Sequence, residues 1–135
     1  MSLLFPAALY PPGLIFLMDD FYVAFNLFYV GHYLFLVFSV YVLVRSWGIG
    51  PWPALFAALT TLLGGYFLSL GAVFTHFQSS VWLPSAFYFS GNFLRTRRMS
   101  DFFGALACLV CQNLAASPET SIMTAPAIVA IVSWV

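Results

Sequence analysis

Five polar residues in a largely apolar sequence are the candidates for chemistry: Asp19, Asp20, His76, Gln78 and Glu119. Two adjacent carboxylates suit a general base, or a pair of ligands for a hard divalent cation that accompanies a phosphate-bearing substrate. A histidine can contact a phosphate or move a proton near neutral pH. The sequence thus offers Asp19 and Asp20 as catalytic candidates, and His76, Gln78 and Glu119 as candidates for substrate binding.

Each of these residues also has a structural interpretation, and the sequence leaves both open. Asp19 and Asp20 precede a long apolar run, where a carboxylate commonly caps the start of a helix. His76 could bond a neighbouring backbone carbonyl. Glu119 follows Pro118 in a turn and could cap the helix that starts there.

The composition of the chain points to a lipid environment. Of its 135 residues, 63% are hydrophobic and only 6% are charged, whereas soluble domains carry about 25% charged residues. So few charges cannot cover a protein surface in water, so we expect an integral, all-α membrane protein. The net charge of zero argues against nucleic acid as a partner. No P-loop, dinucleotide fingerprint or nucleophile elbow occurs.

The apolar runs predict one membrane domain, 1–135, with a polytopic region over 21–135. Residues 1–20 are too proline-rich to span and are expected to form an extended or re-entrant segment on the outer face. Residues 82–94 are too few to cross a membrane, so the third span should begin near Phe74 or Thr75 and kink or restart at Pro84. Four full spans and a truncated fifth are expected: 21–44, 54–70, about 75–94, 102–116 and 122–135.

The arginines predict the orientation of these spans. All four follow the first or the third span, and by the positive-inside rule that side is cytoplasmic. They are Arg45, Arg95, Arg97 and Arg98. The carboxylates of Asp19, Asp20 and Glu119, together with His76, then face the outer side.

Three further residues are expected to be structural. His32 lies midway along the first span, where an interhelical hydrogen bond is the favoured role. Cys108 and Cys111 lie within an apolar run and fit small packing residues better than a redox pair, which needs an exposed site.

Four segments together resemble the YfhO-like bacterial membrane proteins: LLFPAALYPPGLIF, YVLVRSWGIGPWPALFAAL, GGYFLSLGAVFTHFQSSVWLP and LVCQNLAASPET. The resemblance implies a multi-pass protein of the bacterial plasma membrane, within the wider group of GT-C-type glycosyltransferases. Such enzymes take a sugar from a polyprenyl-phosphate carrier and pass it to a cell-envelope acceptor on the outer face. Besides the bilayer, a lipid-linked sugar is therefore the expected partner.

The resemblance also implies that the chain is an excerpt. The acidic residue typical of this group lies in a first large outer loop after a first helix, and both would fall upstream of Met1. Asp19 and Asp20 do not occupy that position, so the chain alone is expected to be inactive. The alternative is a transporter or non-catalytic assembly protein for a lipid-linked substrate, which would favour polar groups and broken helices at the midplane. The clustering of polar groups at one face favours the enzyme.

Overall fold

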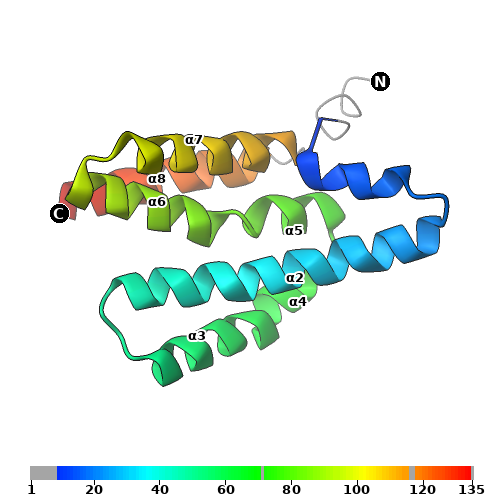
Figure 1. The fold of residues 1–135 in the computed structure, drawn as a ribbon, viewed down its shortest axis with the longest axis horizontal. Helices are drawn as coiled ribbons and strands as arrows, with labels where there is room; N and C mark the ends of the chain where they lie inside the picture. The colour runs from blue at the N-terminus through cyan, green and yellow to red at the C-terminus, as the bar shows by residue number, and fades with distance from the viewer. Residues whose placement is uncertain (1–8, 71, 116–117, 135) are drawn as a thin grey trace.

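The computed structural model describes residues 9–70, 72–115 and 118–134, and in this part of the chain every element is a helix. Figure 1 shows the long helix α2 running between a layer of α6, α7 and α8 on one side and α3 with α4 on the other. The expected all-α class is confirmed. The elements are the 3₁₀ helix η1 (Pro11–Leu17), α2 (Phe21–Ser46), α3 (Pro51–Leu63), α4 (Gly65–Leu70), α5 (Phe74–Ser80), α6 (Leu83–Thr96), α7 (Met99–Leu114) and α8 (Pro118–Trp134).

Helix α2 is apolar on its exposed faces as well as on its buried one. Its buried residues recur about every fourth position, as expected for one face of a helix that packs on the rest of the bundle. Yet Tyr22, Leu34 and Phe38, on other faces, are 77%, 66% and 64% exposed. A helix that is hydrophobic all round is typical of a protein interior or a membrane span.

Two helical segments are long and apolar enough to cross a membrane: α2 with 26 residues, and the 20 residues of Pro51–Leu70, which comprise α3 and α4 with a bend at Gly64. The remaining described helices are shorter. Helix α7 has 16 residues, and α8 begins at Pro118, ahead of the predicted start at residue 122. Four full spans are thus not shown in the described residues, and the remaining predicted spans stay predictions.

The predicted third span is broken, as the sequence indicated. It begins at Phe74 as α5, stops at Ser80 and restarts at Leu83 as α6. Pro84 lies in the first turn of α6, where its missing N–H costs no helical hydrogen bond. The 14 residues of α6 make about 21 Å of helix, which is less than a hydrocarbon core of about 30 Å.

The N-terminal segment differs from its prediction. An extended or re-entrant stretch was expected over residues 1–20, but Pro11–Leu17 forms η1, because the fixed φ of two prolines suits the first turn of a helix. Residues 1–8 of the predicted segment lie outside the described part. Tyr10, at the start of η1, is buried in a cluster with Phe28 of α2 and Ala115.

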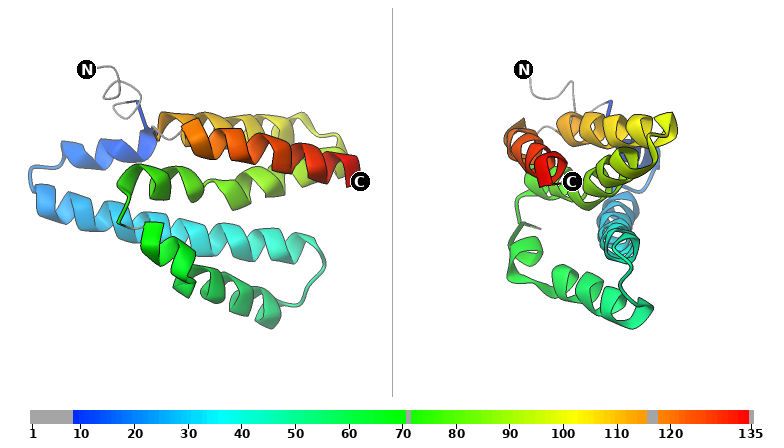
Figure 2. Two further views of the ribbon diagram at one scale, coloured as in Figure 1. Left: turned by 180° about the vertical axis from the view of Figure 1, so that it is seen from behind. Right: turned by 90° about the vertical axis from the view of Figure 1, so that its left-hand side faces the viewer.

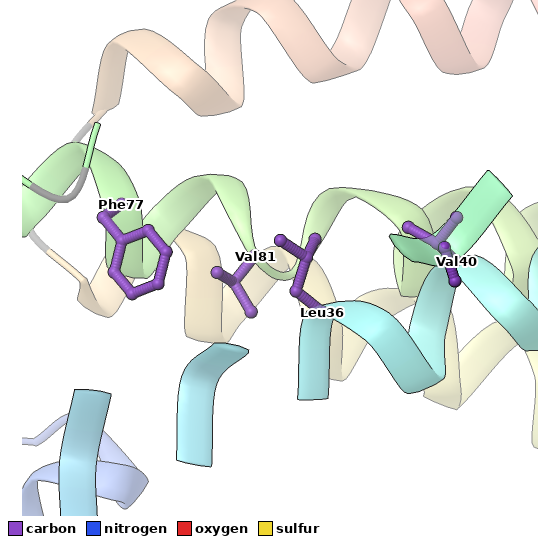
Figure 3. Packing of buried hydrophobic residues seen from close by; sticks show 5 residues of the cluster. Leu36, Val40, Phe77 and Val81 are labelled. Carbon is purple, nitrogen blue, oxygen red and sulfur yellow. The ribbon is translucent and has the colours of Figure 1, made fainter. Parts of the chain in front are cut away.

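The core lies along α2, where residues of α3 and α5 pack against it. Phe77 of α5 and Val81, which follows α5, form one buried cluster with Leu36 and Val40 of α2 and Ala58 of α3. Figure 3 shows Val81 beside Leu36, between Phe77 and Val40. Seen along the bundle in the right-hand view of Figure 2, α6, α7 and α8 form one group beside α2. Gly104 permits the close approach of α7 to α6, because a Cβ there would lie 2.7 Å from Cδ1 of Phe89.

The two ends of the bundle carry different charges. The turns that follow α2 and α6 lie at the same end, on the left of Figure 1, and Nη1 of Arg95 donates to the Ser46 carbonyl at 3.1 Å. This places all four arginines at one end. Helices α5 and α8 both begin at the opposite end. The separation of the arginines from His76 and Glu119, expected from the sequence, is present in the fold.

Candidate functional site

His76 and Glu119 come together at the end of the bundle opposite the arginines. His76 lies in the first turn of α5 and Glu119 in the first turn of α8, and His76 Nε2 is 4.0 Å from Glu119 Oε2. Their side chains are 35% and 79% exposed. The structure thus joins two of the predicted substrate-binding residues in one solvent-accessible pair.

This pair borders a small cavity of about 210 Å³. Polar groups from three helices line it: the Tyr66 phenol of α4, the Ser80 hydroxyl of α5 and the Thr120 hydroxyl of α8. Leu83 and Met123 supply its apolar wall. The site therefore offers hydrogen-bond donors and acceptors beside an ionisable pair, within a largely apolar molecule.

Gln78 is not among the residues that line this cavity, so the structure does not bring it together with His76 and Glu119. The Gln78 side chain is only 5% exposed. Two positions along a helix turn the side chain by about 200°, so Gln78 faces away from His76. Ser80, four positions after His76, lies on the same face and takes the place expected for Gln78.

A buried polar network lies behind the cavity and joins α5, α7 and α8. The Ser79 hydroxyl donates to the Gln112 carbonyl at 2.9 Å and contacts the Thr120 hydroxyl. The side-chain amide of Gln112 donates from Nε2 to Thr124 Oγ1 at 2.8 Å. The Thr124 hydroxyl in turn donates to the backbone carbonyl of Thr120 at 2.7 Å. Because Thr120 is adjacent to Glu119, the network fixes the first turn of α8 against α5 and thereby holds Glu119 beside His76.

The sequence analysis missed this network, although a signal was present. Gln112, Thr120 and Thr124 interrupt apolar runs, and the two threonines are four positions apart on one helix face. Oε1 of Gln112 is buried without a hydrogen-bond partner among the described residues.

The structure does not bring Asp19 and Asp20 to His76 and Glu119. Both aspartates are exposed at the corner between η1 and α2, which in Figure 1 lies beyond the ends of α5 and α8. Asp20 Oδ1 accepts from the backbone N–H groups of Tyr22 at 2.9 Å and Val23 at 3.2 Å. The capping interpretation of Asp20 is confirmed. In the described part of the chain no three His, Cys, Asp or Glu side chains lie close enough to hold a metal, so a divalent cation stays a prediction.

Glu119 also has the structural role that the sequence left open. As the second residue of α8 it places a carboxylate near the positive end of the helix dipole. A carboxylate in this position stabilises the helix whether or not a substrate binds. The two interpretations of Glu119 are therefore compatible.

A second polar group links the N-terminal segment to the bundle. The Tyr10 hydroxyl lies 2.7 Å from both His32 Nε2 and Trp82 Nε1, and His32 Nδ1 lies 2.7 Å from the Phe28 carbonyl. A carbonyl can only accept, so Nδ1 carries the imidazole proton, and Nε2 accepts from Tyr10. The indole of Trp82 in turn donates to the tyrosine oxygen. Burial raises the pKa of Tyr10, and the Trp82 hydrogen bond opposes that rise.

His32 is thus hydrogen-bonded, as predicted, but its long-range partner belongs to the N-terminal segment and not to another spanning helix. An apolar cavity of about 300 Å³ adjoins this group, bordered by η1, α2 and Trp82. His76 and Glu119 do not line that cavity, so the two sites are distinct.

Comparison with known proteins found no relative of this chain. The chain matches no protein-family model, no curated protein and no solved structure. Any function of this chain is therefore a proposal that depends on the geometry of its sites.

Proposed function

We propose that this chain is part of a multi-pass membrane glycosyltransferase that moves a sugar from a polyprenyl-phosphate carrier to an acceptor on the outer face. The observation that carries the proposal is the pairing of His76 and Glu119, from two separate helices, at a cavity opposite the arginine-bearing end. Ionisable side chains are costly in so apolar a protein, and such residues commonly mark a substrate site.

In this proposal His76 binds the phosphate of the carrier. A protonated imidazole can donate a charge-assisted hydrogen bond to a phosphate oxygen, and Glu119 Oε2 lies 4.0 Å from His76 Nε2. The hydroxyls of Ser80 and Thr120 supply further hydrogen bonds from the cavity wall. Asp19 and Asp20, at the corner between η1 and α2, would border the entrance for the acceptor in this proposal.

The size of the cavity is consistent with partial enclosure of such a ligand. Sites that bury most of a small molecule typically have volumes of about 300–1,000 Å³. At about 210 Å³ this cavity can enclose a phosphate or part of one sugar, but not a whole lipid-linked sugar. The isoprenoid chain would then remain in the bilayer beside the helices.

A transporter of a lipid-linked substrate is the second candidate, and one observation favours it. The α5–α6 segment is broken, and three consecutive polar residues before the break, Gln78, Ser79 and Ser80, are buried. Transporters commonly place interrupted helices at their substrate sites. Here Ser79 bonds other helices, which also suits a purely structural role.

The two candidates can be separated in vesicles that contain the whole protein carrying this chain. A labelled polyprenyl-phosphate sugar is supplied, and both its movement across the membrane and the transfer of sugar to acceptor are measured. His76→Ala and Glu119→Ala are expected to lower transfer at least tenfold, whereas Thr75→Ala, an exposed neighbour outside the cavity, should leave it unchanged.

The outcomes against the proposal are equally definite. Full transfer in both alanine variants would contradict the site. Movement of the lipid-linked sugar without any transfer would support the transporter instead. The charge-exchanged variant with His76→Glu and Glu119→His distinguishes substrate binding from a structural ion pair, because it can restore stability but not the cation beside the phosphate.

A further inference from the structure

A third cavity lies at the arginine-bearing end of the bundle, where neither His76 nor Glu119 lines it. It has a volume of about 350 Å³ and opens between the last turns of α2 and α6. Its wall is amphipathic: Leu43 of α2 and Trp47, the residue that follows α2, line it together with Tyr88, Asn92 and Arg95 of α6. Neither of the other two cavities described above is lined by an arginine beside apolar and aromatic side chains.

The charge at this end is strongly positive. Arg95 is exposed, and its Nη1 donates to the carbonyl of Ser46, which also lines the cavity, so the bond holds the guanidinium beside the end of α2. That bond uses one of five N–H donors of the guanidinium, so others remain for a ligand. Arg45 donates to the Ile49 carbonyl. Asp101, the acid at this end, accepts from the Thr96 hydroxyl and forms no ion pair with an arginine in the described residues.

We propose that this cavity binds one anionic phospholipid of the surrounding bilayer, with its phosphate on Arg95 and Asn92. Arginine binds phosphate oxygens through its fork of N–H donors, and tryptophan and tyrosine favour the level of the headgroups. The walls formed by Leu43 and Trp47 suit the glycerol and first methylenes of the lipid and offer nothing to free phosphate. The inference requires that the bundle lies in a membrane, but it does not depend on sugar transfer.

Gly91 and Arg97 provide two variants that test lipid binding at this cavity. Gly91 lines the cavity, and a Cβ there would meet no atom within 4 Å, so Gly91→Leu can fill the cavity without a clash at the backbone. Arg97 carries the same charge at the same end but does not line the cavity, and its φ is 54°. Asparagine tolerates that conformation, so Arg97→Asn is a matched control for Arg95→Gln.

The experiment measures lipid retention by the full chain in detergent, using native mass spectrometry. Phosphatidylglycerol and phosphatidylcholine with identical acyl chains are the probes. We expect one phosphatidylglycerol to be retained in preference to phosphatidylcholine. Its affinity should fall about fivefold or more in Arg95→Gln, since one cation near a membrane surface contributes on the order of a fivefold effect. Gly91→Leu should lose the bound lipid, and Arg97→Asn should stay within twofold.

The variant Arg95→Lys keeps the positive charge but alters the hydrogen bond to the Ser46 carbonyl. It therefore tests whether lipid binding depends on the charge or on that bond, and we expect it to retain the lipid. Equal retention of the two lipids would overturn the inference, as would equal losses in Arg95→Gln and Arg97→Asn. Glycerol phosphate binding as tightly as phosphatidylglycerol would also overturn it, since the site would then be one for a soluble phosphate. Failure of the sugar-transfer assay would leave all of these outcomes unchanged.

Discussion

The hydroxyl of Tyr10 lies 2.7 Å from Nε2 of His32, and this bond fastens the N-terminal segment to the middle of α2. Both residues are buried, and Trp82, at the break between α5 and α6, donates to the same hydroxyl at 2.7 Å. One phenol therefore joins three parts of the fold that are distant in the sequence. One of these three parts is the break between α5 and α6, where Trp82 lies.

Loss of that hydroxyl should destabilise the protein. Tyr10→Phe leaves His32 Nε2 and Trp82 Nε1 without their partner, and an unsatisfied buried polar group costs about 1–3 kcal/mol. The free energy of unfolding in detergent, measured by denaturant titration, should fall by that amount. Tyr22→Phe is the control, because Tyr22 is largely exposed. An equal effect of the two substitutions would contradict the role of Tyr10.

The same residue should make stability depend on alkaline pH. Burial raises the pKa of Tyr10 above its ordinary value near 10, so the folded chain holds this proton more tightly than the unfolded chain. Its contribution is fully present below about pH 10 and is lost as the pH rises further, by about 1.4 kcal/mol per pH unit for one proton. The Tyr10→Phe variant should lose stability less steeply above pH 10. Parallel curves for both proteins would refute this linkage.

The two adjacent aspartates should differ in their contribution to stability. Asp20 caps α2 through two backbone N–H groups, and removal of such a cap costs about 0.5–2 kcal/mol. Thermal unfolding should therefore show a loss for Asp20→Ala, little change for Asp20→Asn, and a shift within about 0.5 kcal/mol for Asp19→Ala. A larger loss in Asp19→Ala than in Asp20→Ala would be evidence against the cap.

Two glycines of neighbouring helices should respond in opposite directions to alanine. At Gly104 the new Cβ would lie 2.7 Å from the Phe89 ring, so the helices must separate or the ring must move, at a cost of about 1–3 kcal/mol. At Gly91 nothing lies within 4 Å, and alanine should stabilise the helix by about 0.5–1 kcal/mol. The free energies of unfolding of the two variants test the close contact between α6 and α7. A Gly104→Ala variant as stable as the original protein would contradict that contact.

Local sequence signals predicted the parts of the fold that local chemistry decides. Asp20 marks the start of α2, and Pro84 marks the restart of the broken span, because caps and prolines act within one helical turn. The burial of Gln78 could not be predicted, because hydropathy alone does not say which face of α5 is buried. The bend at Gly64 and the break after Ser80 could not be fixed exactly for a related reason, since an apolar run does not show where a helix will break.

Long-range partners could not be predicted from the sequence. Tyr10 and Trp82 are far apart in the chain, and no pattern in either segment indicates that an indole and a phenol will meet. The meeting of His76 and Glu119 was predicted only at the level of a shared membrane face. Their 4.0 Å separation depends on how α8 returns against α5 through the Ser79, Gln112 and Thr120 network.

His76 and Glu119 lie at one end of the bundle and the four arginines at the other, so in a membrane-spanning bundle they should lie on opposite sides of the bilayer. The chain has no lysine, so trypsin can cut it only at the arginine-bearing end. In sealed vesicles, trypsin applied to the cytoplasmic side should release fragments ending at Arg45, Arg95, Arg97 or Arg98, and trypsin applied to the outer side should release none. Cleavage at these arginines from the outer side would contradict the orientation and place His76 and Glu119 on the wrong face for the proposed reaction.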